Sequence, residues 1–368
     1  MSWQENLQNS VRTAEALCQI MGAGPEMLEQ YRQIVARYPM CITPYYLSLI
    51  DWNDPKDPIR MMSVPSLAEL AAQGDEDTSG EQSNTKLDGV QHKYGQTVLI
   101  LSTNQCAMYC RHCFRKRMVG LTTQELNERL DQAVAYIRAN PSINNILVSG
   151  GDALLNPNAL IARYLEELTA LPQLDLIRFG SRLPVVLPER IYDDPELLDL
   201  FATYGKKKAL YVVTQFNHPR ELTPEAHKAL ACLTERGVFL RNQTVLLKGV
   251  NDDPAVLGEL FRGLTRVGVA PYYVFQCRPV KGVMGHFQVP INRGVEIVRD
   301  AKAMQNGVGK SARYAMSHPR GKIEIVGKTE DGQVLFHFHQ CKYPQEDTGR
   351  IFARRLADDQ CWLDDTLN

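Results

Sequence analysis

The chain has 368 residues, of which 44% are hydrophobic, and this length suits one large domain or a core with appended parts. Its 41 basic and 42 acidic residues nearly cancel, which gives no electrostatic case for nucleic acid or an anionic membrane as a partner. The first residues lack the pattern of a secretory signal, and no apolar stretch approaches membrane-spanning length, so we expect a cytoplasmic protein.

Residues 1–89 are expected to form an N-terminal helical region. The segment "MLEQYRQIVARYPM" places apolar residues at helical spacing. Residues 73–88, "QGDEDTSGEQSNTKLD", are polar and nearly free of large apolar side chains. Such a composition predicts a surface loop or flexible linker.

Residues 90–290 alternate between short apolar runs and amphipathic helical patterns. The predicted strands lie at 97–103, 145–150, 174–181, 209–216, 238–247 and 271–277. Strands separated by helices predict parallel βαβ units. Because eight such units close a complete barrel, these six predict an α/β fold with a partial, open (βα)6 barrel. Residues 291–368 lose the rhythm and are expected to form a C-terminal segment that covers the site.

Three clustered cysteines directly follow the first predicted strand. Cys106, Cys110 and Cys113 have C-x3-C-x2-C spacing at the strand end where parallel α/β folds build their sites. Four thiolates complete a cubane iron–sulfur cluster, so three leave one iron open to a small chelating ligand. The alternative is a zinc site completed by a distant cysteine or by His112.

The segments "TNQCAMYCRHC", "VSGGDALL", "GSRLPVVLPERI" and "NQTVLLKGVND" together resemble the lysine 2,3-aminomutase family of radical S-adenosylmethionine (SAM) enzymes. The resemblance implies a radical SAM fold with a [4Fe-4S] cluster, SAM and pyridoxal 5′-phosphate. It also implies a 5′-deoxyadenosyl radical and a 1,2-amino migration on an amino acid or amine. An electron donor such as flavodoxin or ferredoxin would supply the electron, and a homo-oligomer is compatible with the family.

The resemblance also implies a set of SAM contacts at the ends of successive strands. Arg182 suits the carboxylate of SAM, and Asp152 can accept a hydrogen bond from its ammonium group. The full set is Ser149, Gly150, Gly151, Asp152, Ser181, Arg182, Gln215, Asn242 and Gln243. The alternative for Asp152 is an ordinary helix cap, and for the last three it is a satisfied core amide.

The substrate side departs from the family pattern. The lysine enzymes carry a carboxylate directly after "PYYxYQC", whereas this chain carries Arg278. This charge reversal disfavours lysine and favours a substrate with an acidic or neutral side group. Lys281 adds to the positive field, and Arg115 matches the arginine that holds the α-carboxylate of the substrate.

The pyridoxal phosphate side is also altered. Lys93 and Thr97 stand where the family places phosphate-binding arginines, and Lys322, after Gly321, is the nearest equivalent of the lysine that forms the imine. The alternative for Lys322 is a surface lysine that opens a strand. Further on, His337, His339 and Cys341 are metal-ligand types at strand spacing, and the alternative there is packing or surface exposure.

Two other functions stay open at this point. The first is a radical SAM enzyme of the same fold without pyridoxal phosphate, which carries out hydrogen abstraction, epimerisation or another rearrangement. The second is a non-catalytic iron–sulfur protein. The segments that resemble SAM contacts argue against the second, because an electron carrier has no need of them.

Overall fold

The computed structural model describes residues 2–71, 73–121, 126, 128–364 and 367, and a single twelve-stranded sheet runs through these residues. Each strand pairs with the next one in chain order. The strands are β1 (Thr85–Leu87), β2 (Val90–Tyr94), β3 (Thr97–Thr103), β4 (Asn145–Gly150), β5 (Leu176–Gly180), β6 (Ala209–Thr214), β7 (Phe239–Leu246), β8 (Ala270–Gln276), β9 (Arg313–His318), β10 (Gly321–Lys328), β11 (Val334–Cys341) and β12 (Ile351–Arg354).

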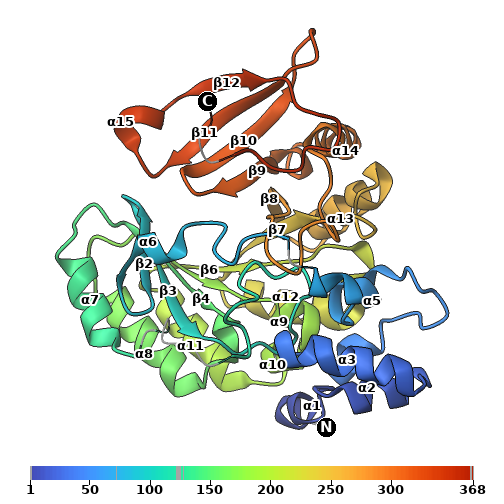
Figure 1. Ribbon diagram of the computed structural model, residues 1–368. Helices are drawn as coiled ribbons and strands as arrows, with labels where there is room; N and C mark the ends of the chain where they lie inside the picture. The colour runs from blue at the N-terminus through green and yellow to red at the C-terminus, as the bar shows by residue number, and fades with distance from the viewer. Residues whose placement is uncertain (1, 72, 122–125, 127, 365–366, 368) are drawn as a thin grey trace.

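Strands β3 to β8 are parallel and form the partial barrel that the sequence predicts. In β4 and β7, buried residues alternate with half-buried ones, because one face packs under helices and the other lines the interior. The covering helices are α7 (Leu130–Arg138), α8 (Asn158–Thr169), α11 (Pro195–Gly205), α12 (Pro224–Glu235) and α13 (Pro254–Arg266) (Figure 1).

Three of these helices begin with the same local signal, an N-cap residue followed by proline. The caps Asp194, Thr223 and Asp253 each accept a hydrogen bond from a backbone amide in the first turn. Proline at the next position has no amide hydrogen to leave unpaired. Each cap contributes about 1 kcal/mol to the stability of its helix.

The N-terminal region is mostly helical. Its helices are α1 (Trp3–Gln8), α2 (Ala14–Met21), α3 (Pro25–Arg37), α4 (Pro44–Leu47), α5 (Pro58–Ser63) and the 3-10 turn η1 (Leu67–Leu70). Segment 73–88 differs from the predicted loop, because it contains α6 (Glu81–Asn84) and β1 and buries Ser79 and Glu81. Glu81 pairs with Arg115 and Arg117, so charge rather than apolar area holds this segment in place.

The C-terminal segment continues the sheet. Strand β9 pairs with β8 in parallel, and β9 to β12 then pair antiparallel. The buried hydroxyl of Tyr314 in β9 donates to Gln276 at the end of β8. The remaining elements are α9 (Leu183–Val186), α10 (Glu189–Tyr192), α14 (Ile291–Ala303), α15 (Pro344–Asp347), η2 (Ala153–Leu155), η3 (Pro219–Glu221) and η4 (Gly309–Ser311).

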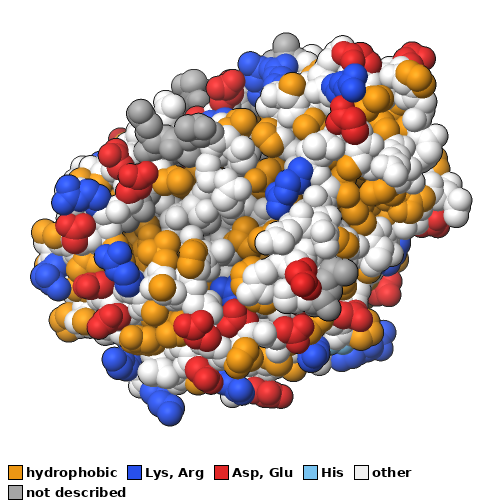
Figure 2. Space-filling model, turned by 90° about the horizontal axis from the view of Figure 1, so that it is seen from below, with side chains coloured by type: hydrophobic (Ala, Val, Ile, Leu, Met, Phe, Trp, Pro, Cys, Tyr) orange, Lys and Arg blue, Asp and Glu red, His pale blue; other side chains and the backbone are white. Residues whose placement is uncertain are grey.

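Figure 1 shows the N-terminal helices α1 to α3 at one end of the molecule and β10 to β12 at the other. Basic and acidic side chains are interspersed over the face seen in Figure 2, in keeping with the balanced composition. Among the described residues, none of the helices has the length and apolar character needed to cross a membrane.

Candidate active site

A cavity of about 380 Å³ lies inside the barrel, bounded by the cysteine loop, α6, β10 and β11. It brings together residues that are far apart in the sequence. Those predicted for the site that line it are Lys93, Thr97, Cys106, Cys110, Cys113, Arg115, Ser149, Gly150, Gly151, Asp152, Ser181, Arg182, Gln215, Gln243, Arg278 and Lys322.

Asn242 is the predicted contact that does not line the cavity. It is buried, accepts a hydrogen bond from the Phe216 amide and donates to the Phe216 carbonyl and to Thr244. The pairing of β7 with β8 shifts register between Asn242 and Gln243, and neighbouring strand residues face opposite sides. Asn242 is therefore the satisfied core amide of the alternative interpretation, whereas Gln243 reaches the cavity.

The three cysteines are free thiols at one end of the cavity. Burial, followed by the charge of Cys110, raises the pKa of Cys113 to about 11, and burial and neighbouring charges raise the pKa of Cys106 as well. Uncompensated thiolates are therefore costly here, and a cation that binds them would relieve that cost.

Two glycines lock the end of β4 against the cysteine loop. Gly150 has a φ of +118°, and a Cβ at this position would lie 2.2 Å from the Thr103 carbonyl oxygen. A Cβ on Gly151 would lie 2.2 Å from the Gln105 carbonyl oxygen. The missing side chains thus allow close approach to the cysteine loop, in addition to any approach to a ligand.

Asp152 caps a short helical turn and also lines the cavity. Its carboxylate caps η2 by accepting from the Leu154 amide at 3.1 Å, and it accepts from the Arg182 amide at 2.6 Å. Burial raises its pKa to about 6, although the hydrogen bonds act in the opposite direction. The carboxyl group also lines the cavity, so its pairing with the ammonium group of SAM stays a prediction.

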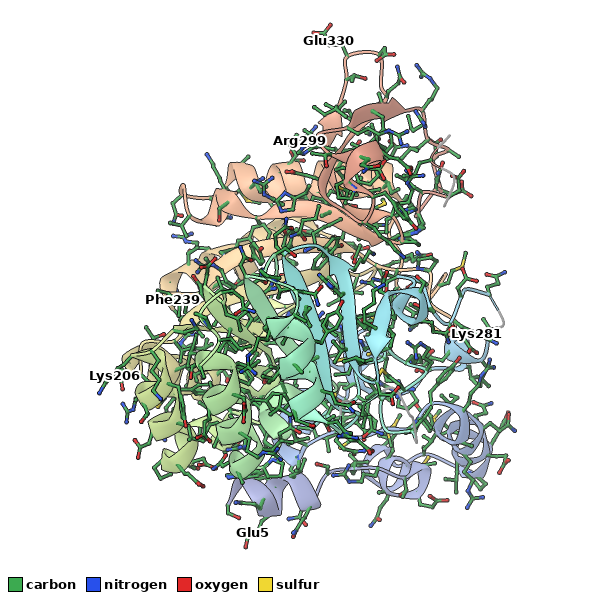
Figure 3. All side chains as sticks on the ribbon, turned by 90° about the vertical axis from the view of Figure 1, so that its left-hand side faces the viewer. Glu5, Lys206, Phe239, Lys281, Arg299 and Glu330 are labelled. Atoms are coloured by element: carbon green, nitrogen blue, oxygen red, sulfur yellow. The ribbon has the colours of Figure 1, made fainter. Side chains whose placement is uncertain are left out.

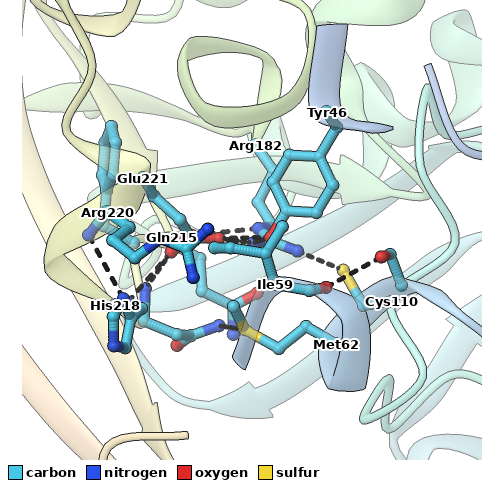
Figure 4. Close-up of polar contacts among 12 residues, drawn as sticks. Tyr46, Ile59, Met62, Cys110, Arg182, Gln215, His218, Arg220 and Glu221 are labelled. Carbon is cyan, nitrogen blue, oxygen red and sulfur yellow. Dashed lines mark hydrogen bonds and ion pairs between the residues drawn. The ribbon is translucent and has the colours of Figure 1, made fainter. Parts of the chain in front are cut away.

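Arg182 is held by protein partners beside the cysteine loop (Figure 4). Its guanidinium donates to Cys110 Sγ at 2.7 Å, to the Gln215 carbonyl at 3.0 Å and to Glu221 at 2.5 Å. Glu221 is buried and also accepts from the Tyr46 hydroxyl at 2.7 Å. The sequence analysis missed Tyr46 and Glu221, because Tyr46 lies in α4 and Glu221 in η3, and neither follows the end of a predicted strand.

Arg115 is paired with a residue that the sequence placed in a linker. Its Nε lies 2.9 Å from Glu81 Oε1, and one terminal nitrogen lies 3.4 Å from both Ser149 Oγ and the Gly150 carbonyl oxygen. Glu81 also pairs with Arg117 at 2.8 Å. Glu81 and Arg115 are 34 residues apart in the chain, so no local sequence pattern predicts that they pair.

Arg278 lines the cavity and has no carboxylate within ion-pair distance among the described residues, although the more distant charge of Glu81 favours its protonated form. Its Nη1 is buried and makes no hydrogen bond. The guanidinium carbon of Arg278 lies 4.1 Å from the centroid of the Phe114 ring. The guanidinium carbon of Arg115 lies 4.6 Å from the same centroid. Burial lowers the pKa of Arg278 to about 10. Lys281, expected nearby, instead pairs with Glu76 at 3.5 Å and lies at the edge of the molecule in Figure 3.

Two lysines of the cavity have strongly altered acidity. Burial, reinforced by the charges of Arg178 and Arg278, lowers the pKa of Lys322 to about 7, and its Nζ lies 4.3 Å from the Tyr273 ring centroid. Burial also lowers the pKa of Lys93 to about 7, and its Nζ donates to the His318 carbonyl at 2.6 Å. Lys322 thus presents a partly deprotonated amine to the cavity and is not a surface lysine.

Comparison with known proteins identifies the family. The model of the radical SAM superfamily matches residues 100–257. L-lysine 2,3-aminomutase of Clostridium subterminale is 40% identical over 83% of this chain and 73% of its own length. This chain belongs to the lysine 2,3-aminomutase family.

Two further relatives cover nearly the whole chain. A putative L-lysine 2,3-aminomutase of Aquifex aeolicus (strain VF5) is 39% identical over 92% of this chain and 91% of its own. Glutamate 2,3-aminomutase of Clostridioides difficile (strain 630) is 36% identical over 97% of this chain and 85% of its own. The chain is therefore an enzyme. Its relatives are named for different amino-acid substrates, lysine in some and glutamate in another.

The radical SAM family implies a [4Fe-4S] cluster and SAM, and the donor set fits both. The three free thiols line one cavity, and thiolates are the usual ligands of such a cluster. In the described part of the chain, no group of three or more His, Cys, Asp or Glu side chains is arranged to hold a single metal ion. That statement covers His337, His339 and Cys341; His337 instead lies 3.7 Å from Glu324, and His339 contacts the Tyr273 ring.

Proposed function

We propose that this enzyme is a radical SAM aminomutase that moves an amino group between adjacent carbons of an amino acid with an acidic side chain. The observation that carries the proposal is the Arg278 guanidinium in the cavity lining, whose buried Nη1 makes no hydrogen bond. The similarity to glutamate 2,3-aminomutase supports it, since that name states an acidic substrate.

The chemistry of Arg278 argues for an anion. The buried Nη1 of Arg278 makes no hydrogen bond, which costs about 1–3 kcal/mol, and a carboxylate would offset that cost by accepting from the guanidinium. The Phe114 ring stacks on the guanidinium and fixes its plane. A lysine ammonium placed at the same point would face a like charge in a closed cavity, which costs several kcal/mol.

Lys322 and Lys93 support the retention of pyridoxal phosphate. Bound pyridoxal phosphate would supply an aldehyde and an electron-accepting ring, while the cluster and SAM supply the radical. The amine of Lys322 is nucleophilic when neutral, and its lowered pKa of about 7 makes a large neutral fraction available. Lys93 and Thr97 offer a partial positive charge and a hydroxyl donor to a phosphate.

The test uses anaerobically reconstituted protein with SAM, dithionite and pyridoxal phosphate. L-glutamate is expected to yield 3-aminoglutarate, detected by chromatography of derivatised amino acids, whereas L-lysine is expected to yield no β-lysine. Arg278→Asp should lower kcat/KM for glutamate by about 100-fold or more, because it places an anion against an anion. Lys281→Asp is the matched control, since Lys281 pairs at the surface.

Efficient amino migration on lysine by the unmodified enzyme would contradict the proposed specificity. Glutamate consumption without any pyridoxal phosphate would instead support the alternative radical enzyme of the same fold. A cytoplasmic location, a flavodoxin or ferredoxin donor and a homo-oligomer belong to the same proposal and stay predictions.

A further inference from the structure

The cavity lining carries more positive side chains than its carboxylates neutralise. Arg115 and Arg182 are paired with Glu81 and Glu221. The other cationic side chains of its lining have no carboxylate at ion-pair distance among the described residues; they are Lys93, Arg178, Arg278 and Lys322. Because burial holds the pKa of both lysines near 7, the two arginines are the permanent charges.

Arg178 lies in the middle of β5, on the face that lines the cavity. Its Nη2 donates to Asn145 Oδ1 in β4, and its buried Nε makes no hydrogen bond. Burial lowers the pKa of Arg178, yet a guanidinium stays protonated at neutral pH. A permanently charged group that lines a cavity and has no ion-pair partner among the described residues favours an anionic ligand.

A row of polar side chains extends from Arg178 across the neighbouring strands. Asn145 hydrogen bonds with Thr97 Oγ1 in β3, with heavy atoms 3.0–3.2 Å apart, and the two residues are register partners. Thr97 itself lines the cavity. Thr97 of β3, Asn145 of β4 and Arg178 of β5 thus form a hydrogen-bonded row across three neighbouring strands. Thr97 and Arg178 line the cavity.

Lys322 lines the same cavity from β10. Arg178 is the first of the charges that act on this amine, ahead of Arg278. A ligand with an aldehyde at Lys322 and an anionic group a few ångströms away would therefore satisfy both side chains. Lys93 Nζ already donates to the His318 carbonyl at 2.6 Å, and a lysine meets a phosphate as a point charge, without the two parallel hydrogen bonds of a guanidinium.

We propose that Arg178 binds the phosphate group of pyridoxal phosphate, beside Asn145 and Thr97, at a subsite separate from that of Arg278. This inference rests on the proposed function, because it assumes the cofactor. It assigns the two cavity arginines that lack an ion pair among the described residues, Arg178 and Arg278, to two oxyanions, the phosphate of the cofactor and the side-chain carboxylate of the substrate. A bidentate guanidinium is the side chain best matched to a phosphate.

The test compares two aldehydes that differ only in the phosphate, pyridoxal phosphate and pyridoxal. Their dissociation constants are measured from the fraction of Lys322 that borohydride converts to the pyridoxyl derivative, quantified by peptide mass spectrometry. In the unmodified protein, pyridoxal phosphate should bind more tightly. In Arg178→Gln its affinity should fall by about 10- to 100-fold, while the affinity for pyridoxal stays within about twofold.

Two further variants keep the test independent of folding. Arg178→Lys retains a positive charge but loses the paired donors of the guanidinium. Its ratio of the two affinities should lie between those of the unmodified protein and Arg178→Gln. Arg241→Gln is the matched control, because Arg241 is a half-buried arginine of β7 outside the cavity lining and should leave both affinities unchanged. Circular dichroism and iron content confirm that each variant is folded.

The outcomes separate this inference from the function on which it rests. An unmodified protein in which neither aldehyde labels Lys322 overturns the role of the cofactor and this inference together. Labelling with an unchanged affinity ratio in Arg178→Gln overturns this inference alone. A higher KM for glutamate in Arg178→Gln, again with an unchanged ratio, assigns Arg178 to a substrate carboxylate and also overturns the phosphate site.

Discussion

Lys322 illustrates how one residue obtains its chemistry from its surroundings. The sequence shows only a lysine after a glycine. In the fold its amine lies near the rings of Tyr273 and Phe275 and close to two guanidinium groups. Desolvation and like charges both disfavour the ammonium form, so the amine is available as a nucleophile near neutral pH.

The pH dependence of labelling tests this shift. Lysine reacts with an aldehyde as the neutral amine, so the labelling rate of Lys322 should rise with pH and level off above about 7 to 8. A lysine with the ordinary pKa of about 10.4 would continue to rise beyond pH 10. The rate is measured by borohydride trapping and peptide mass spectrometry.

Lys206 is exposed and gives the reference profile in the same samples. If Lys322 follows the profile of this surface lysine up to pH 10, its amine is not desolvated in solution.

The end of β4 shows how an element positions ligands that it does not itself carry. Gly150 and Gly151 lie against the backbone of the cysteine loop, and the amide of Asp152 donates to the Gln105 carbonyl at 2.8 Å. The end of β4 therefore holds the loop that contains Cys106 in position. Glycine is required at these two positions because of the contact, and at Gly150 also because of the positive φ.

Gly151→Ala tests whether this contact positions the cysteine loop. Its Cβ would lie 2.2 Å from a backbone oxygen, so the loop must move. We expect a loss of about 1–3 kcal/mol in the free energy of unfolding and fewer iron atoms per chain after reconstitution. Denaturant unfolding and an iron assay measure the two effects.

Gly95→Ala is the control, because nothing lies within 4 Å of its added Cβ. Iron content equal to that of the unmodified protein in Gly151→Ala would show that the loop does not depend on this contact.

At the scale of the whole molecule, the C-terminal strands complete the cavity. Ser317, Lys322 and Gln340 line it together with the barrel strands. A buried link ties the two parts: Tyr314 donates to Gln276, whose amide donates to the carbonyls of Val289 and Cys361. The position of Lys322 therefore depends on how β9 docks on β8.

Tyr314→Phe removes the donor and leaves the buried Gln276 Oε1 without this partner. The expected cost is about 1–3 kcal/mol in the free energy of unfolding, together with slower labelling of Lys322. Urea unfolding and the trapping assay measure these two quantities.

Tyr343→Phe is the control, since Tyr343 is 44% exposed. Unchanged unfolding and labelling in Tyr314→Phe would mean that this link does not hold the C-terminal strands in place.

The sequence by itself determined the parts of this protein that depend on local patterns. Strands β3 to β8 and the helices between them follow from the alternation of apolar runs with amphipathic helical patterns. The cysteine motif lies within eight residues of one loop, so its place after the first barrel strand was also readable. Family membership followed from the same local segments.

Only the tertiary structure decided which charges are neutralised. Arg182 and Glu221 are 39 residues apart, and the segment around Glu81 has the composition of a linker although its carboxylate is buried. Arg178 sits within an otherwise apolar strand, and its unmatched charge becomes visible only when β3, β4 and β5 are placed side by side. Pairing of charges depends on distance in space and on burial, and neither quantity is encoded in the spacing of residues along the chain.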